Sequence, residues 1–379
     1  MAITHIAELE TPALLLERRR MLDNIARMRA HMQKLKVSFR PHVKTAKCVE
    51  AALAMCGGVP GSITVSTLRE ADYFADHGFT DILYAVGITP NKMAHVQALQ
   101  ARGVTMTVIL DGVDAAHALV AEAASRKMKI RALIEIDCDG NRAGVLPDSP
   151  VLLEVARILA GGGVTVGGVM THAGSSYECR SDASLRAMAE QERARTLDAA
   201  QRLRAAGHEA PVVSVGSTPT ALFAQNLAGI TEVRAGVFVF FDLVMAGLGV
   251  CAVDDIAVSV LTTVIGHQEE KGWTLVDAGW MAMSRDRGTA AQPLDQGFGL
   301  VCDADGAALH DYIMVSANQE HGIIAHRDGK AGTPLAVPVG TQLRVFPNHA
   351  CATAAQHARY QVVEDSPVIQ ATWGRIGGW

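Results

Sequence analysis

Apolar residues in the first two-thirds of the chain form short, mostly continuous runs, and segments with helical spacing separate them. Continuous rather than alternating runs are typical of strands that helices cover on both faces, as in a parallel sheet. The runs predict eight strands, which cover Ser38–Lys44, Ser62–Thr67, Asp81–Val86, Thr105–Asp111, Ile130–Asp137, Val164–His172, Val212–Ser217 and Glu232–Val239.

The segments between these runs predict helices. Eight strand–helix units in series favour a closed (β/α)₈ barrel over an open sheet. An open doubly wound fold is the alternative, but no Gly-x-Gly-x-x-Gly follows an early strand. The expected helices cover Leu68–His77, Pro90–Ala101, Val113–Lys127, Pro150–Ala160 and Asp182–Ala206, and an alanine-rich helical pattern also starts at Val49.

The pattern changes after about residue 250, where apolar and polar residues alternate more and little helix is expected. Turn residues such as Asp303–Gly306 separate the expected strands. We therefore predict a barrel over 18–250 and a β-rich domain formed by 1–17 and 251–379. Its strands are expected at Thr11–Glu17, Ala257–Gln268, Gly272–Asp277, Gly299–Val301, Asp311–Ser316, Gln342–Val345, Tyr360–Val363 and Ile369–Trp373.

Composition narrows the class of protein. With 49% hydrophobic and 19% charged residues, the 379-residue chain has enough apolar surface for a large core. The formal net charge of −5 argues against a nucleic-acid surface or a polybasic membrane patch. No apolar run is long enough for a membrane span, and the first residues lack the pattern of a signal peptide. The seven scattered cysteines suit a reducing compartment, so we expect a cytoplasmic protein.

Polar residues gather where the expected strands end. Lys44 closes the first strand, Arg142 follows the fifth, and His172 with Tyr177 follows the sixth. The stretch Gly216–Thr220 follows the seventh strand. Because barrels build their active sites at the carboxyl ends of the strands, these residues are expected to share one face.

Two of these features suggest a cofactor, and each has an ordinary reading as well. Lysine forms Schiff bases with carbonyl cofactors, pyridoxal phosphate above all, but a solvated loop lysine is the commoner case for Lys44 taken alone. Gly216, Ser217 and Thr218 precede a helical run from Ala221 and could cradle a phosphate. The same residues would equally make an ordinary Ser/Thr helix cap.

The other strand-end residues are less distinctive. An arginine that follows a turn, like Arg142, usually lies on the surface. A histidine at a strand end, like His172, is usually a core residue whose hydrogen bonds are satisfied. Gly236, in the eighth strand pattern, allows close approach of a ligand or simply a bend. Glu232 and Arg234 are expected to pair with barrel partners.

The C-terminal part contains one candidate metal site. Pro347–Cys351 is expected to be extended, so His349 and Cys351 would project to the same side and could bind one divalent ion. Two protein ligands would leave positions for water and substrate, although a bare His-x-Cys also arises by chance. Loop solvation is expected for Arg285 and Arg287, whereas Glu320–His321, between apolar runs, needs partners.

Taken together, the motifs resemble one family across essentially the whole chain. They occur in order at 40–45 (Arg-Pro-His-Val-Lys-Thr), 139–144, 171–177, 216–220, 232–236, 277–279, 319–322 and 347–351 (Pro-Asn-His-Ala-Cys). This series is similar to that of the fold-type III pyridoxal-phosphate enzymes of the D-serine dehydratase and D-threonine aldolase group.

The resemblance implies an alanine-racemase-like barrel with a C-terminal β-rich domain, paired into a homodimer. It implies pyridoxal 5'-phosphate bound to Lys44 as a Schiff base, with Arg142 facing the pyridine nitrogen. It also implies a divalent metal on His349 and Cys351; zinc suits these ligands, and manganese or magnesium suits a site completed by water. The remaining cofactor contacts that it implies are His172 and Tyr177 near the ring and Gly216, Ser217, Thr218 and Gly236 at the phosphate.

The implied activity is dehydration of a β-hydroxy-D-amino acid, namely D-threo-3-hydroxyaspartate, D-serine or D-threonine, to a keto acid and ammonia. Lys44 would take the Cα proton, and the metal would assist the departure of hydroxide. The alternative within the family is an aldolase that forms glycine and an aldehyde; Cys351, where the aldolases have aspartate, favours the dehydratases. A non-catalytic barrel protein that binds pyridoxal phosphate and a metal-dependent barrel hydrolase are the alternatives from other classes.

Overall fold

A computed structural model of the chain describes residues 4–329, 332 and 334–379. The first three residues of the expected 1–17 segment lie outside this range. The chain divides into two compact units. The barrel unit contains Arg27–Gly236 with Gly378–Trp379, and the β unit contains the residues up to Ala26 with Val237–Gly377.

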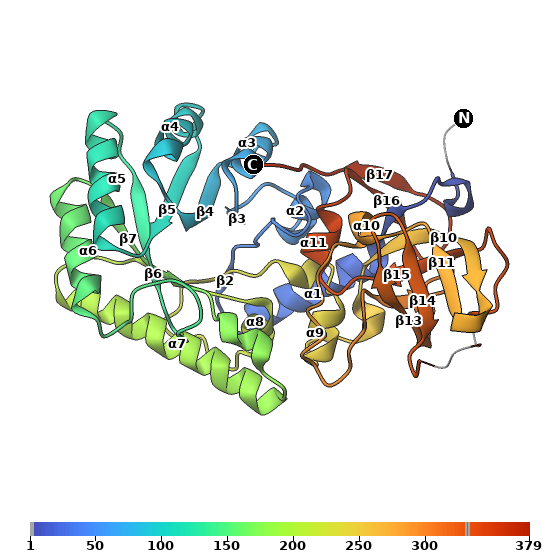
Figure 1. Ribbon diagram of the computed structural model, residues 1–379. Coiled ribbons are helices and arrows are strands. Elements are labelled where there is room, and N and C mark those ends of the chain that lie inside the picture. The colour runs from blue at the N-terminus through green and yellow to red at the C-terminus, as the bar shows by residue number, and fades with distance from the viewer. Residues whose placement is uncertain (1–3, 330–331, 333) are drawn as a thin grey trace. The chain divides into compact units, whose positions relative to one another are not determined.

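The barrel unit is built on a curled sheet of eight parallel strands with the order β2-β9-β8-β7-β6-β5-β4-β3 (Figure 1). An isolated parallel bridge between His42 and Thr64 links the two ends of this order, and Val43 N–H donates to Thr64 O at 2.9 Å. The predicted alternation of strands and helices is therefore confirmed. The strands are β2 (Ser38–Phe39), β3 (Ile63–Val65), β4 (Asp81–Gly87), β5 (Thr105–Leu110), β6 (Arg131–Ile136), β7 (Thr165–Thr171), β8 (Val212–Val215) and β9 (Glu232–Val233).

Helices cover the outer face of this sheet, and local signals set where they begin (Figure 1). Thr67, Ser149 and Ser181 each accept a backbone N–H as N-caps of α3, α6 and α7, and Pro150 stands at the first position of α6. The helices are α2 (Val49–Met55), α3 (Leu68–Asp76), α4 (Met93–Ala101), α5 (Val113–Ser125), α6 (Pro150–Gly161), α7 (Asp182–Ala205) and α8 (Thr218–Phe223).

Three details of the barrel differ from the prediction. β2 ends at Phe39, and β9 ends at Val233, so the expected strands Ser38–Lys44 and Glu232–Val239 are too long. The chain leaves the regular ladder after β2 because the segment that follows β2 turns to pair with β3. A helix that the pattern did not predict, α1 (Arg18–Lys34), precedes β2.

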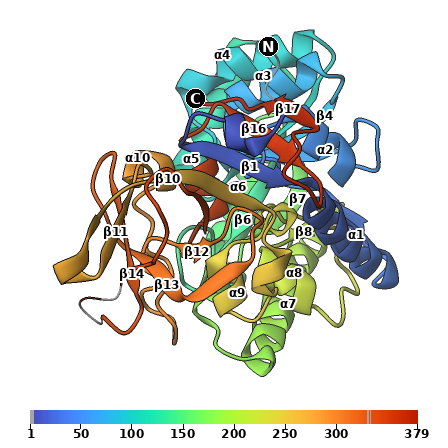
Figure 2. The same ribbon diagram turned by 90° about the vertical axis from the view of Figure 1, so that its right-hand side faces the viewer.

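The β unit contains a nine-stranded sheet, antiparallel except where β1 pairs with β16, and Figure 2 shows β1 beside β10. The expected β-rich architecture is confirmed, although β14 was not predicted and Glu320–His321 lies in the turn before it. Three short helices also belong to this unit: α9 (Leu243–Gly247), α10 (Trp280–Met283) and α11 (Ala350–Ala354). The strands are β1 (Ala13–Glu17), β10 (Val258–Gln268), β11 (Trp273–Val276), β12 (Leu300–Cys302), β13 (Ala308–Ala317), β14 (Gly322–His326), β15 (Gln342–Phe346), β16 (Arg359–Val363) and β17 (Ala371–Gly374).

Buried apolar side chains fix the parallel strands in register. Leu83, Ile109, Leu133 and Met170, from β4 to β7, form one packed cluster in the barrel unit. Because the strands are parallel and neighbouring, their carboxyl ends meet at one edge, and this edge receives the loops that carry the polar residues. Within the described ranges, no helix is long and apolar enough to cross a membrane.

Candidate active site

The strand-end residues of the barrel unit come together at the carboxyl edge of the sheet, as expected. β7, β8, β9 and β2 are consecutive neighbours, and His172, Gly216, Gly236 and Lys44 follow them respectively. His172 Nδ1 donates to Gly216 O at 2.9 Å. A methyl group on Gly236 would lie 2.9 Å from His42 O, so the loop after β9 packs closely on the segment that leads to Lys44.

Two lysines follow β2, and their surroundings differ. Lys47 Nζ lies 3.0 Å from Glu70 Oε1, and the Glu70 side chain is only 1% exposed. Lys44 is exposed, and its ammonium has no hydrogen-bond or ion-pair partner within the part of the chain that the structure describes. A primary amine that is free to react is therefore present at Lys44 and not at Lys47.

His172 is held as a neutral imidazole. Loss of water around the ring, reinforced by the positive charge of Lys44, lowers the pKa of His172 to about 3, although the contact with Gly216 O acts in the opposite direction. Because Nδ1 donates to Gly216, the other ring nitrogen carries no proton. The Tyr177 ring lies beside it, with the ring centroids 6.2 Å apart.

The loop after β8 is a helix cap. α8 begins at Thr218 and not at the expected Ala221, and Ser217 accepts the Thr220 N–H as its N-cap. Gly216 has φ +147°, and a Cβ there would lie 1.7 Å from Arg234 O, so no side chain fits. The ordinary reading of Ser217 is correct, and any phosphate contact would be additional to it.

Arg142 is placed at the end of β6 but is not firmly held. Its Nη2 lies 3.6 Å from Glu135 Oε1, and its side chain is 63% exposed. Burial raises the pKa of Glu135, while Arg142 opposes this rise. The preceding turn is fixed by Asp137 Oδ1, which accepts the Gly140 N–H at 2.6 Å. Glu232 and Arg234 do pair within the barrel, with Arg40 and Ser214 respectively.

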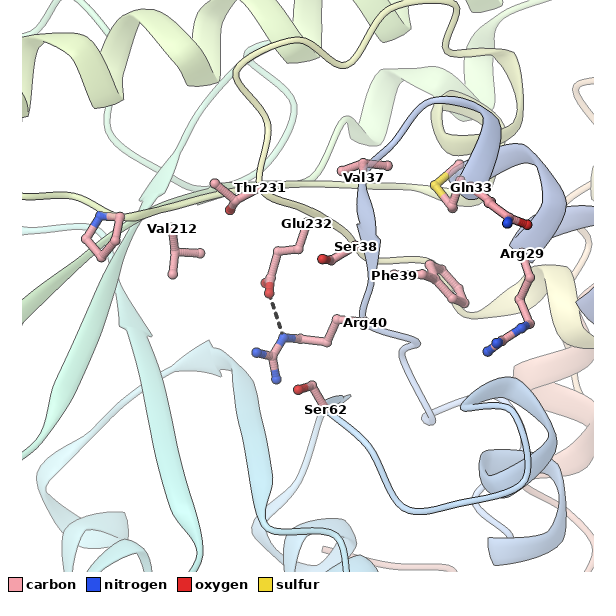
Figure 3. A pocket seen from close by; sticks show the side chains of 12 residues that line it. Arg29, Gln33, Val37, Ser38, Phe39, Arg40, Ser62, Val212, Thr231 and Glu232 are labelled. Carbon is pink, nitrogen blue, oxygen red and sulfur yellow. Dashed lines mark hydrogen bonds and ion pairs between the residues drawn. The ribbon is translucent and has the colours of Figure 1, made fainter.

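A cavity of about 840 Å³ lies at the other end of the strands (Figure 3). Ser38, Val212 and Glu232, which begin β2, β8 and β9, line it, and none of the expected site residues does. Its most prominent charge, Arg40, is already paired: Nε donates to Glu232 at 2.9 Å, and both terminal nitrogens donate to Asp81. The cavity therefore offers no unpaired Arg40 charge for a ligand, and we place the chemistry at the carboxyl edge.

Glu192, in the middle of α7, is a site residue that sequence reasoning missed. Its side chain is buried, and Oε1 accepts the N–H groups of Ala173 at 3.1 Å and Gly216 at 3.0 Å. These residues adjoin His172 and Ser217. Glu192 lies at helical spacing from Ala189 and Thr196 on the buried face, and a carboxylate on such a face was the available signal.

The candidate metal residues lie in the β unit, but not in an extended segment. His349 is the N-cap of α11, and Cys351 is the second residue of that helix. The helix begins there because Asp242 Oδ2 accepts the Ala350 N–H at 3.0 Å. The same-side argument for an extended chain was therefore wrong. The two side chains are nevertheless close enough to hydrogen-bond each other.

The surroundings of His349 favour positive charge. Asp286 Oδ2 accepts a hydrogen bond from His349 Nδ1 at 2.9 Å. Burial by itself would lower the pKa of His349, but Cys351, Asp286 and Asp242 together raise it to about 11. An imidazole and a thiolate in a negative environment suit a divalent cation, and Asp286 leaves Nε2 available as the ligand atom.

The residues described contain no cluster of three or more His, Cys, Asp or Glu that could hold a metal. A metal at His349 and Cys351 would therefore have two protein ligands and open positions. The neighbouring Arg287 pairs with Asp295 at 2.7 Å, and Arg285 lies over the Trp280 ring. None of the seven cysteines is in a disulfide.

Comparisons with known proteins agree with this architecture. Residues 16–244 match the alanine racemase N-terminal domain, and residues 257–363 match the "Putative serine dehydratase domain". The chain is 53% identical to D-threo-3-hydroxyaspartate dehydratase of Delftia sp. over 374 residues, 98% of each chain. It is 29% identical to D-serine dehydratase of Dictyostelium discoideum, over 97% of this chain and 96% of that one. It is 26% identical to 3-hydroxy-D-aspartate aldolase of Paracoccus denitrificans, over 97% of this chain and 92% of that one.

Two similar solved structures are mutants of D-threo-3-hydroxyaspartate dehydratase. A histidine-to-alanine mutant is 51% identical with a TM-score of 0.95, covering 99% of this chain and 97% of that one. A cysteine-to-alanine mutant in the metal-free form is 52% identical with a TM-score of 0.96, covering 99% and 100%. The mutated histidine and cysteine are two positions apart, as His349 and Cys351 are.

Proposed function

The chain belongs to the alanine racemase N-terminal domain family, and from its 53% identity to D-threo-3-hydroxyaspartate dehydratase over 98% of the chain we propose that it is a dehydratase of a β-hydroxy-D-amino acid. The proposed cofactors are pyridoxal 5'-phosphate and a divalent metal. The observation that carries the proposal is the unpartnered amine of Lys44 at the carboxyl edge of the sheet. The 53% identity to D-threo-3-hydroxyaspartate dehydratase makes D-threo-3-hydroxyaspartate the first candidate substrate, ahead of D-serine and D-threonine.

The residues at this edge fit pyridoxal phosphate. Lys44 supplies the amine, and the Gly236 N–H, which makes no hydrogen bond to any described residue, supplies a donor for the phosphate. When bound, the cofactor supplies an electron sink for the charge that develops at Cα. The other residues proposed to hold it are Gly216, Ser217 and Thr218 at the phosphate, His172 and Tyr177 near the ring, and Arg142 at the pyridine nitrogen.

The chain's own groups would divide the remaining work. Lys44 Nζ would hold the cofactor at rest and then take the Cα proton of the bound substrate as a general base. His172 would pack near the ring without adding a positive charge, because its low pKa keeps it neutral. Arg142 is permanently charged, so it would donate to the pyridine nitrogen and keep a proton off that atom.

His349 and Cys351 would hold the metal, which would act as a Lewis acid on the β-hydroxyl and ease its departure. The metal-free form of the cysteine-to-alanine mutant of the similar dehydratase supports this assignment. A nitrogen and a sulfur ligand suit zinc, while positions filled by water would also admit manganese or magnesium. We also propose a cytoplasmic homodimer, as the family resemblance implies, and sedimentation velocity tests the oligomeric state.

The test is a product assay on protein supplied with pyridoxal phosphate and a divalent ion. D-serine, D-threonine and both diastereomers of D-3-hydroxyaspartate are the substrates, with the L-isomers as controls. A keto acid with ammonia from a D-isomer is the expected result. Glycine with an aldehyde would instead make the protein an aldolase, like the Paracoccus relative, and would remove the argument from Cys351.

Two variants test the assigned residues. Lys44→Ala should abolish turnover and the visible absorbance of the lysine-bound cofactor, and retention of that band would contradict the cofactor assignment. A chelator should inactivate the protein, and a divalent ion should restore it. His349→Ala should lose bound metal by elemental analysis, and unchanged metal content would show that the ion binds elsewhere.

A further inference from the structure

Glu192 is a buried acid that the proposed chemistry does not use. It lies in the middle of α7, and its side chain is 2% exposed. A carboxylate is rarely buried so completely unless it is paired, because the desolvation of its charge is costly. No basic side chain forms a salt bridge with it in the described ranges. Burial raises the pKa of Glu192, and its hydrogen bonds oppose this rise more than the charge of Arg234 does, so the hydrogen bonds are the main compensation for its burial.

The partners of Glu192 are backbone groups of two loops and the Thr220 side chain. Oε1 accepts the Ala173 N–H at 3.1 Å and the Gly216 N–H at 3.0 Å, and the Thr220 side chain also hydrogen-bonds the carboxylate. Ala173 follows His172 after β7, and Gly216 precedes Ser217 after β8. One carboxylate group therefore joins the loops that follow two adjacent strands and the first turn of α8.

Other contacts show that the position of the second loop is tightly set. Ser176 Oγ lies 2.9 Å from Ser217 Oγ, which is a second link between the same loops. A Cβ on Gly216 would collide with Arg234 O, so the loop approaches the neighbouring strand end as closely as a backbone can. An apolar side chain in place of Glu192 would fill the space but would leave two buried N–H groups without acceptors.

We propose that Glu192 is a positioning residue that shapes the phosphate-binding end of the cofactor site. It acts by fixing the peptide groups of Gly216, Ser217 and Thr218 and does not touch the cofactor. This inference rests on the proposed function. The inference goes beyond that function because it separates the role of the loop from that of Lys44. Glu192 should affect the affinity for a ligand that has a phosphate and have little effect on the affinity for one that lacks it.

The experiment compares two ligands on the apoprotein: pyridoxal phosphate and pyridoxal, which lacks the phosphate. Dissociation constants are measured by fluorescence for wild type, Glu192→Leu, Glu192→Gln and Glu192→Asp. Thr196→Val is the matched control, because Thr196 is also fully buried on α7, one turn away, and its hydroxyl donates only to Glu192 O. For each protein, the ratio of the dissociation constants for pyridoxal and pyridoxal phosphate gives the gain in affinity that the phosphate provides. This ratio is compared among the variants.

We expect Glu192→Leu to weaken pyridoxal phosphate binding about 30-fold and pyridoxal binding less than about threefold, because the two hydrogen bonds that Oε1 accepts from the loops are lost. Glu192→Gln keeps an acceptor oxygen and should stay within about threefold of wild type, as should Thr196→Val. If Glu192→Leu does not fold, Glu192→Asp decides, since it keeps the charge but withdraws the oxygens by about 1.5 Å. It should also lose affinity for the phosphorylated ligand only.

Equal losses for both ligands, or wild-type affinity in Glu192→Leu and Glu192→Asp, would overturn the positioning role. Failure of the proposed function would look different. In that case wild-type protein would bind pyridoxal phosphate no better than Lys44→Ala does, and it would show no absorbance of a lysine-bound cofactor.

Discussion

Replacing the two lysines after β2 one at a time should separate chemistry from stability. Lys44 and Lys47 lie three residues apart, but only Lys47 is paired, with Glu70 at 3.0 Å. We predict that Lys44→Met loses the absorbance of the bound cofactor with little change in stability. Lys47→Met should keep the absorbance, provided that the protein is folded, and should be strongly destabilised.

The magnitude follows from the surroundings of Glu70. Its Oε1 accepts from Lys47, and its Oε2 accepts the Ser66 N–H at 3.1 Å. Without Lys47 the buried carboxylate keeps only uncharged donors. Breaking a buried ion pair by removing one partner costs about 3–5 kcal/mol. Because the Lys47 side chain is 17% exposed, we expect the lower end, about 3 kcal/mol. An exposed lysine such as Lys44 should cost about 0.5 kcal/mol or less.

The assay is urea denaturation of each apoprotein, followed by absorbance spectra after addition of pyridoxal phosphate. Lys47→Met together with Glu70→Gln is the control, since removing both charges should recover part of the stability. Loss of the cofactor band in folded Lys47→Met, with the band retained in Lys44→Met, would refute the reasoning. Equal destabilisation by both substitutions would show that the pair with Glu70 contributes nothing.

Three further substitutions test the surroundings of the two sites. The pKa of His172 is about 3 in the folded protein and about 6.5 in the unfolded chain. Between these two values only the unfolded chain binds the proton. His172 therefore lowers the free energy of unfolding by about 1.4 kcal/mol for each pH unit below about 6.5. His172→Asn should remove only the contribution of His172, because burial also lowers the pKa of His42, so the slope should become shallower by about 1.4 kcal/mol per pH unit; an unchanged slope would contradict this. Asp286→Ala should weaken metal binding about 10–100-fold in titrations against a competing chelator. Asp286→Asn keeps an acceptor for His349 and should lose less affinity. Wild-type affinity in Asp286→Ala would exclude a role of Asp286 in orienting His349. Gly216→Ala should lower the free energy of unfolding by about 3 kcal/mol or prevent folding. Gly87 has open space around it, so Gly87→Ala should change that free energy by less than about 1 kcal/mol. Similar denaturation midpoints for the two variants would disprove the steric argument.

The periodic pattern of apolar residues was sufficient to predict most of the barrel. Strands β4 to β7 are continuous apolar runs buried under helices, and each one begins and ends within about two residues of its predicted bounds. β2 and β9 were predicted too long. The end of β2 depends on a contact between the following segment and β3, which no local pattern encodes. α1 was missed although its buried positions Met21, Ile25, Met28 and Met32 have helical spacing, so that signal was present in the sequence.

The site was predictable only in part. Residues at strand ends could be located because a parallel sheet brings those ends together, and Lys44, His172 and Gly216 are found there. The residues that hold these strand-end residues in place could not be located from the sequence. Asp286 lies 63 positions from His349, and nothing near either residue indicates that they meet. The geometry assumed for His349 and Cys351 was wrong because Asp242, far away in sequence, starts a helix at Ala350.

Buried carboxylates explain how a chain with few charges can hold its polar loops in place. Glu192 accepts the N–H next to His172, Glu70 accepts the N–H of Ser66, and Asp242 accepts the N–H next to His349. Glu192 and Asp242 bind the backbone beside a candidate site residue, and Glu70 binds the loop after β3. A carboxylate only accepts hydrogen bonds, and loops at strand and helix ends have N–H groups that the regular ladders do not satisfy. Burying an acid there is costly in isolation, but each one satisfies N–H groups that would otherwise be buried unpaired. Such acids therefore position the loops of the candidate site, although none of the three is itself assigned to the chemistry.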